Sequence, residues 1–168
     1  MKYSVRHAVT ATVACYFTFY AITATQWHFI DTINLIFHEA GHTVTFFFGQ
    51  FISIASGSLF QILIPAVCCL YFYQQGQRYN ASLLLFWVGQ NVINVSIYAR
   101  DATVMQLPLL GGDSVMHDWN YLLSAMGMLK FTPYIADIIF IVGIGILFCA
   151  LCFSIINGTK QEKPQHLL

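Results

Sequence analysis

Long apolar runs are the feature that most limits how this chain can fold. Five of them are close to the roughly 20 residues that an α-helix needs to cross a bilayer, namely 8–26, 31–49, 52–73, 81–99 and 133–156. Charged residues make up only 8% of the sequence, against roughly 25% in soluble domains. Because so few charges cannot cover a soluble surface, we expect an all-α integral membrane protein. It should form a single membrane domain over 1–168, with a polar C-terminal tail at 157–168.

The stretch at 100–117, RDATVMQLPLLGGDSVMH, holds a proline and a glycine pair and shows no helical periodicity. Irregular backbone of this kind persists at membrane depth only where it is buried in protein or faces water. The apolar piece that follows, at 118–129, would be only about 18 Å long as a helix. We therefore expect five to six transmembrane helices, one of them broken or re-entrant, with an irregular entry through 105–117.

Basic residues near both ends indicate the orientation of the chain. Under the positive-inside rule, Lys2 and Arg6 favour a cytoplasmic N-terminus, and Lys160 and Lys163 favour a cytoplasmic C-terminus. Five crossings cannot satisfy both ends, whereas a sixth crossing at 118–129 would. We expect a multi-pass protein of the cell (inner) membrane. The formal net charge is zero and no basic stripe is present, which argues against nucleic-acid binding.

The run at 31–49 contains LIFHEAGHTVTFFF, in which His38, Glu39 and His42 form an HExxH pattern. Residues four apart share one face of a helix, so both imidazoles can reach one metal ion. Glu39 lies about 100° around the helix from His38, close enough to reach a water on that metal. Zinc binds imidazole nitrogen readily, keeps an open position in catalytic sites and lowers the pKa of bound water. Glu39 can then act as the general base.

The apolar flanks distinguish a metal site from a chance occurrence of this pattern. In a soluble protein, a lone HExxH is often part of an ordinary surface helix. Inside a membrane span, each ionisable group costs on the order of 3 kcal/mol on insertion scales, and such groups usually mark function. Three of them within five residues, at metal-ligand spacing, predict a site for one Zn²⁺ ion. A polar cluster that only joins helices is the weaker interpretation.

A catalytic zinc site usually has a third protein ligand, which must come from another segment here. The acidic and histidine side chains available near the spans are Asp101, Asp113, His117, Asp118 and Asp137. A salt bridge with the neighbouring Arg100 would account for Asp101, and an exposed or capping position would account for Asp137. The ligand candidates left open are Asp118, His117 and Asp113. The two aspartates also have ordinary structural explanations, because Asp118 could cap the N-terminus of a helix and Asp113 could stabilise a turn.

These residues resemble the site-2 protease family of intramembrane zinc metalloproteases, over about residues 30–130. After its HExxH helix, the family carries a small-residue hairpin helix with a Gly-Pro-x-x-Asn pattern, and Gly57-Ser58-Leu59-Phe60-Gln61 stands in that place. The family then has a Pro-containing stretch and an Asp-Gly pair that opens a helix and supplies the third ligand. LPLLGGDSVMHDWNYLL holds the corresponding position. Alignment on the helix points to Asp118, and alignment on the glycines points to Asp113.

The chain departs from the family pattern at several positions. Asp118 lacks the following glycine, Gln61 replaces the asparagine, and the family's Asn-x-x-Pro spacing is absent. The resemblance implies a zinc metalloendopeptidase, with Glu39 as its general base and a zinc-activated water as nucleophile. The implied zinc ligands are His38, His42 and Asp118, with His117 and Asp113 as alternative ligands or as supporting groups. Gln61, Asn91 and Asn94 would hold an extended substrate backbone, which needs hydrogen-bond partners in lipid.

The expected partners are a transmembrane or membrane-proximal peptide substrate, the lipid bilayer and a regulatory membrane protein, since no soluble recognition domain is evident. The alternative is a non-proteolytic metal-binding membrane protein, either a metal transporter or an inactive protease-like scaffold. A transporter would carry polar groups along a path through the spans. The strong ones cluster instead, although Asp137, Asn91 and Asn94 leave that interpretation open.

Overall fold

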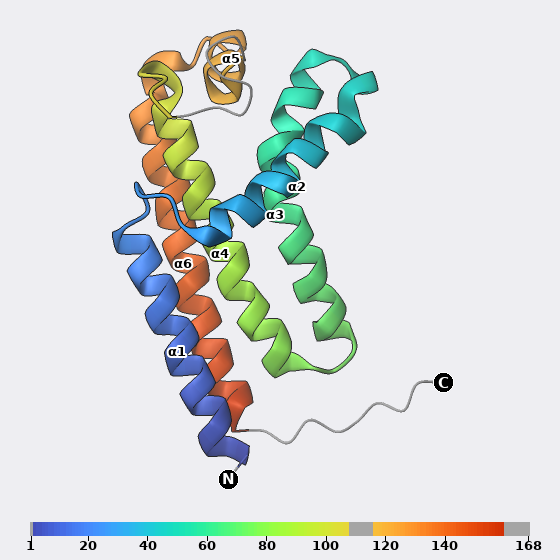
Figure 1. Ribbon diagram of the computed structural model, residues 1–168, viewed down its shortest axis with the longest axis vertical. Coiled ribbons are helices and arrows are strands. Elements are labelled where there is room, and N and C mark those ends of the chain that lie inside the picture. The colour runs from blue at the N-terminus through green and yellow to red at the C-terminus, as the bar shows by residue number, and fades with distance from the viewer. Residues whose placement is uncertain (1, 108–115, 160–168) are drawn as a thin grey trace.

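The computed structural model describes residues 2–107 and 116–159, and every regular element in these two segments is helical (Figure 1). The α-helices are α1 (Lys2–Ile22), α2 (Phe29–Thr45), α3 (Gln50–Gln74), α4 (Arg78–Arg100), α5 (Asp118–Ala125) and α6 (Thr132–Gly158). Short 3₁₀ turns are η1 (Phe46–Phe48), η2 (Asp101–Thr103) and η4 (Leu129–Phe131). The expectation of an all-α fold is confirmed.

Three helical stretches of the described chain are long and apolar enough to cross a membrane: Gln50–Gln74, Arg78–Thr103 and Leu129–Gly158. These stretches coincide with the predicted spans at 52–73, 81–99 and 133–156, which supports the interpretation as a membrane protein. The full count of five to six crossings is not confirmed. α2 has 17 residues, or about 25 Å of helix. α5 has 8 residues, or about 12 Å, which is too short to cross.

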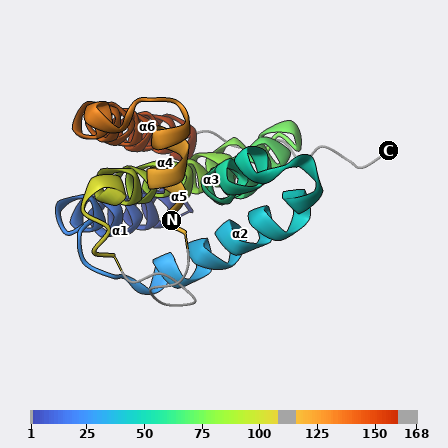
Figure 2. The ribbon, with the colours of Figure 1, turned by 90° about the horizontal axis from the view of Figure 1, so that it is seen from above.

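The central helix of the bundle is α4, which packs against α6 and α3 and also contacts α1, while α3 packs against α2 (Figure 1; Figure 2). Small residues allow the close approach of α4 and α6. A Cβ on Gly143 would lie 3.0 Å from the backbone nitrogen of Ile93 and 3.1 Å from the carbonyl oxygen of Gly89. Small residues at helix contacts are typical of membrane bundles, where packing rather than the hydrophobic effect drives association.

The first two helices do not form an antiparallel pair: α1 runs along the bundle, whereas α2 runs obliquely across it (Figure 1). α1 ends partway along α4 and α6, where Tyr20 and Ala24 pack with Ile93, and α2 continues obliquely from there. The irregular segment 23–28 therefore lies beside the other helices instead of at an end of the bundle.

This arrangement corrects the prediction of a sixth crossing at 118–129. That segment forms α5, which contacts η2 and η4 and stays at one end of the bundle (Figure 1). The start of α1 and the end of α6 nevertheless lie together, because α2 runs obliquely across the bundle and does not return along α1 (Figure 1). The Nη1 of Arg6 donates a hydrogen bond to the carbonyl oxygen of Asn157 at 3.5 Å.

Candidate metal centre

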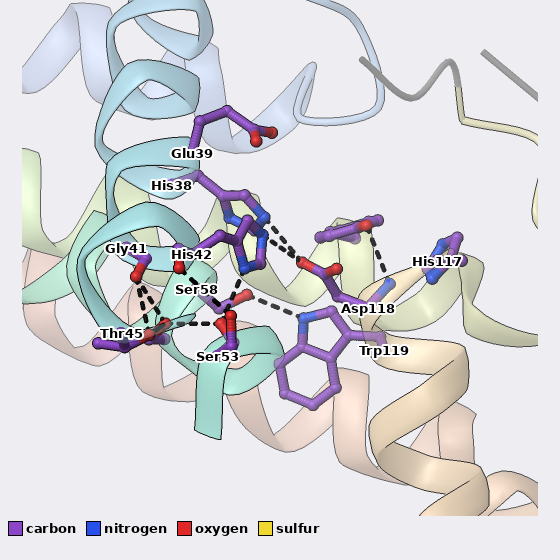
Figure 3. A network of polar contacts seen from close by, with 12 residues as sticks. His38, Glu39, Gly41, His42, Thr45, Ser53, Ser58, His117, Asp118 and Trp119 are labelled. Atoms are coloured by element: carbon purple, nitrogen blue, oxygen red, sulfur yellow. Dashed lines mark hydrogen bonds and ion pairs between the residues drawn. The ribbon is translucent and has the colours of Figure 1, made fainter. Parts of the chain in front are cut away.

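Two imidazoles project from one face of α2, because His38 and His42 are about one helical turn apart. This face packs against the first half of α3 (Figure 3). His38 is buried and His42 is half-buried. Their ring centroids lie 4.8 Å apart, so the two side chains can share one ligand, as the HExxH spacing predicts.

Asp118, the first residue of α5, meets both imidazoles (Figure 3). Its Oδ2 lies 2.8 Å from the Nε2 of His38 and 3.2 Å from the Nε2 of His42. The ligand atoms of these three residues lie within 4.8 Å of one another, so the group could hold a metal ion. Tetrahedral zinc with bonds of about 2.1 Å places its ligands about 3.4 Å apart. Small outward movements of the side chains would therefore admit the ion.

The hydrogen bonding of His42 orients its ring as in a metal-binding histidine. Its Nδ1 lies 2.8 Å from the carbonyl oxygen of Ser53, which can only accept, so Nδ1 carries the proton. In the neutral imidazole, Nε2 is then a bare acceptor. It nevertheless faces a carboxylate oxygen of Asp118, also an acceptor, at 3.2 Å. A metal ion, or a proton on either the ring or the carboxyl group, would relieve this contact between two acceptors, and a carbonyl that orients the other ring nitrogen is typical of metal-binding histidines.

Gly57 of α3 forms the wall against which both imidazoles lie. A Cβ at this position would lie 2.6 Å from the Cε1 of His42 and 2.7 Å from the Nε2 atoms of His38 and His42. Nearby, α2 and α3 approach so closely that a Cβ on Gly41 would collide with the carbonyl oxygen of Ser56. Glycine at position 57 is therefore required by the space that the two histidines occupy.

Replacing Gly57 with alanine should displace the imidazoles, because a methyl group needs about 3.5 Å of separation from neighbouring heavy atoms. We expect metal affinity to fall about 10- to 100-fold, comparable with the loss of a group that orients a ligand. Competition with a chromogenic chelator would measure this. The matched control is Gly145→Ala on α6, where an added Cβ meets nothing within 4 Å. Equal affinity in the two variants would contradict the proposed role of Gly57.

A cavity of about 460 Å³ lies beside the three candidate ligands. Glu39 lines it together with Asp31 on the same helix, and Gln61 and Tyr98 lie on its other walls. Figure 3 shows the carboxylate of Glu39 above the two imidazoles. The side chain is exposed, and within the described segments no residue donates a hydrogen bond to its carboxylate. Glu39 is therefore free to exchange a proton with a molecule in the cavity.

His117 is buried next to Asp118 but does not join the two histidines of α2. Its Nδ1 accepts a hydrogen bond from the backbone nitrogen of Asn120 at 3.3 Å, so Nε2 carries the proton and donates to the Oδ2 of Asp101 at 3.2 Å. The hydroxyl of Tyr98 accepts from the backbone nitrogen of Asp118 at 3.2 Å, and the Tyr98 ring packs on His117. His117 thus supports the backbone that carries Asp118.

Asp101 has partners that differ from the expectation, whereas Asp137 is exposed, as expected. Asp101 does not pair with the neighbouring Arg100; besides His117, it accepts from two backbone N–H groups of the following loop, at 3.0 and 2.9 Å. Arg100 instead pairs with Asp137 at the start of α6. Consecutive helical residues point about 100° apart. Asp101 therefore faces α5 while Arg100 faces α6.

The three predicted substrate-binding residues have different surroundings. Gln61 and Asn94 both line the cavity, and the Nε2 of Gln61 donates to the Oδ1 of Asn94 at 2.7 Å. Asn91 is buried, and its Nδ2 donates to the carbonyl oxygen of Trp87 at 2.9 Å. The Oδ1 of Asn91 has no hydrogen-bond partner among the described residues. Asp113, the remaining ligand candidate, lies outside the part of the chain that the structure describes.

Other residues of the site were missed by the sequence analysis. Ser53 contributes a backbone carbonyl, and Tyr98 is one tyrosine in an apolar run, so neither has a recognisable spacing. Asp31 could have been found, because it lies seven and eleven residues before His38 and His42 and therefore on the same face of α2.

Comparisons with protein-family models, with curated proteins and with solved structures found no match to this chain. The resemblance to the site-2 protease family therefore rests on the residues quoted above.

Proposed function

We propose that this chain is an intramembrane zinc metalloendopeptidase, similar to the site-2 protease family. The observation that carries the proposal is the convergence of His38, His42 and Asp118 on one position, with a ligand spacing that could hold a metal ion. Beside it lies the uncommitted carboxylate of Glu39, on the same cavity. Catalytic zinc sites combine three protein ligands with one open position, and the cavity supplies the open side.

When bound, Zn²⁺ would polarise a substrate carbonyl and lower the pKa of a water molecule held beside it. Glu39 accepts a proton from that water as the water oxygen bonds to the carbonyl carbon. The protonated Glu39 then donates to the amide nitrogen as the C–N bond breaks, which restores its carboxylate. His42 keeps its orientation because the carbonyl of Ser53 holds its Nδ1.

The proposed topology embeds α1, α2, α3, α4 and α6 in the cell (inner) membrane. Because α2 continues obliquely from α1 without running back along it (Figure 1), α1 and α2 together make one crossing, and α3, α4 and α6 make one each. This gives four crossings, fewer than the five to six transmembrane helices expected from the sequence. The start of α1 and the end of α6 would both face the cytoplasm. The irregular segment between α1 and α2 lines the cavity through residues 24–27, which is how non-helical backbone is tolerated at membrane depth. The substrate would be an unwound transmembrane or membrane-proximal peptide, with a regulatory membrane protein as a further partner.

Reconstitution in liposomes with a fluorogenic transmembrane peptide tests this function. We expect cleavage that stops when a zinc chelator is added and returns with Zn²⁺ but not with Mg²⁺, because the ligand set of two imidazoles and one carboxylate suits zinc. Cleavage that persists in chelator would contradict the metal mechanism. Zinc-loaded protein that cleaves no member of a varied peptide panel would contradict the protease assignment.

A metal transporter is the second candidate, because one observation favours it. The buried carboxylate of Asp31 lines the same cavity as the three candidate metal ligands. It would offer a second binding site to a cation that moves through the protein. However, both of its oxygens accept hydrogen bonds from protein donors, including Tyr20 at 2.8 Å. Zinc flux into liposomes without peptide cleavage would support the transporter. An inactive scaffold would bind zinc and show neither activity.

A further inference from the structure

A buried polar network extends from Asp31, near the start of α2, toward the cavity wall opposite. Asp31 is only 3% exposed. Its Oδ2 accepts a hydrogen bond from the backbone nitrogen of His28 at 2.8 Å, which is the ordinary capping role of an acidic residue in a first helical turn. Capping does not involve Oδ1. That atom accepts hydrogen bonds from Tyr20 at 2.8 Å and from Gln90 and Asn94 at 3.1 Å each.

The carboxylate determines which way the neighbouring amides face, because it offers acceptors only. Asn94 must turn its Nδ2 toward Asp31, so its Oδ1 points the other way and accepts from the Nε2 of Gln61 at 2.7 Å. Gln61 therefore directs its amide nitrogen to Asn94, which leaves its Oε1 as the remaining polar atom. No described residue donates a hydrogen bond to this oxygen, and Gln61 lines the cavity.

A second branch of the network has the same polarity. Gln90 turns its Nε2 to Asp31 and accepts from the Nδ2 of Asn34 at 2.9 Å. Asn34 in turn accepts from the indole nitrogen of Trp87 at 3.0 Å, and an indole N–H can only donate. The branch through Asn34 and Gln90 thus runs from the indole N–H of Trp87, which only donates, to the carboxylate of Asp31, which only accepts. The branch through Asn94 also ends at the carboxylate of Asp31. Its other end is the Oε1 of Gln61, which accepts no hydrogen bond from a described residue.

We propose that Asp31 is a positioning residue which, through Asn94, turns the amide oxygen of Gln61 into the cavity as an acceptor for a backbone N–H of a bound extended peptide. This inference rests on the proposed function. Gln61 follows Gly57 by one helical turn, or about 6 Å along α3. An extended peptide advances about 3.3 Å per residue, so the N–H in question lies about two residues from the scissile bond. A buried polar backbone in lipid needs such a partner.

Ester substitution in the substrate tests the inference. The peptides carry an ester in place of one backbone amide, at successive positions on both sides of the scissile bond, and kcat/KM is compared with that of the all-amide parent. For the wild type we expect one position, about two residues from the cut, at which the ester lowers kcat/KM about tenfold, the effect of one hydrogen bond. Gln61→Met keeps the length of the side chain but removes the acceptor. In this variant, the amide-to-ester ratio of kcat/KM at that position should therefore fall to about one.

The role of Asp31 is read from the same amide-to-ester ratio. Asp31→Asn introduces an N–H donor at position 31, which allows the side-chain amides of Asn94 and Gln61 to turn the other way. Asn94→Leu removes the amide that links Asp31 to Gln61 but keeps the carboxylate of Asp31. Both substitutions should therefore reduce the amide-to-ester ratio toward one. The control is Asn34→Leu, which cuts the other branch of the same buried network and should leave the ratio at its wild-type value. A network that only stabilises the bundle would lower activity in all of these variants without changing the ratio.

The outcomes separate the inference from the function on which it rests. Failure of the wild type to cleave the all-amide parent would overturn both. Cleavage with a ratio that Gln61→Met leaves unchanged would overturn the acceptor role of Gln61. A ratio that responds to Gln61→Met but not to Asn94→Leu or Asp31→Asn would overturn the positioning role of Asp31.

Discussion

Glu39→Gln is expected to reduce kcat for peptide cleavage by about 10²- to 10⁴-fold, the usual contribution of a general base, while bound zinc is retained. The physical reason is that glutamine fills the same space but cannot accept the proton of the attacking water. Metal binding should survive because the carboxylate of Glu39 is not part of the group formed by His38, His42 and Asp118. The measurement is single-turnover cleavage in liposomes, together with the zinc content of the same preparation.

Thr43→Val is the matched control for this experiment. Thr43 lies on the exposed side of α2, one turn after Glu39, and its hydroxyl donates only to the backbone carbonyl of Glu39, at 3.0 Å. The substitution should therefore leave both cleavage and zinc content near wild-type values. Cleavage retained in Glu39→Gln would rule out the proposed mechanism. Loss of zinc in that variant would place Glu39 among the ligands instead.

Asp118→Ala is expected to weaken zinc binding by more than about 100-fold, beyond the usual effect of losing a group that only orients a ligand. Among the described residues, the carboxylate of Asp118 is the acidic group that lies against both imidazoles, at 2.8 and 3.2 Å. Without it, two neutral nitrogens remain as ligands, and the positive charge of the ion loses the carboxylate that directly contacts it in a poorly solvated site. Competition with chelators of known affinity measures the change, and peptide cleavage should be lost in parallel.

Three further variants, measured side by side, make this assignment specific. Asp137→Ala removes a carboxylate that pairs with Arg100 away from the site and should leave zinc affinity unchanged. His117→Ala should weaken binding less than Asp118→Ala, because His117 acts through the backbone of Asp118. Asp113→Ala should have no effect. If only the His117 or the Asp113 variant loses zinc, Asp118 is not the third ligand.

The helices could be predicted well from the sequence, because helix formation in an apolar chain depends on local composition. The runs at 52–73, 81–99 and 133–156 lie inside α3, α4 and α6. The direction of each helix was less predictable. α1 and α2 are joined by only a few residues, yet α2 runs obliquely across the bundle and does not return along α1 (Figure 1), since each packs on different neighbours. Irregular backbone that lies beside the other helices is found at 23–28, whereas most of the irregular entry expected at 105–117 falls on residues 108–115, outside the part of the chain that the structure describes.

The polar partners of the site were predictable only in part. Asp118 was one of three candidates, and its choice depends on where α5 docks. Trp119 joins α5 to α3 through a hydrogen bond to Ser58 at 3.1 Å, and Tyr98 holds the backbone of Asp118 from α4. The pairing of Asp101 with His117, and not with Arg100, likewise depends on the direction in which each side chain leaves the end of α4.

The sequence alone determined the chemistry of α2: an apolar helix with two imidazoles and a carboxylate at one turn, because spacing along a helix is a local property. Only the tertiary structure decided which residue completes the group. His38 and Asp118 are 80 residues apart, so their contact depends on the packing of α5 against α3 and α4. The same is true of the carbonyl that orients His42, the glycine that leaves room for both rings, and the carboxylate of Asp31 that orients the amides across the cavity. Each is a contact between separate helices, which residue spacing along one helix does not specify.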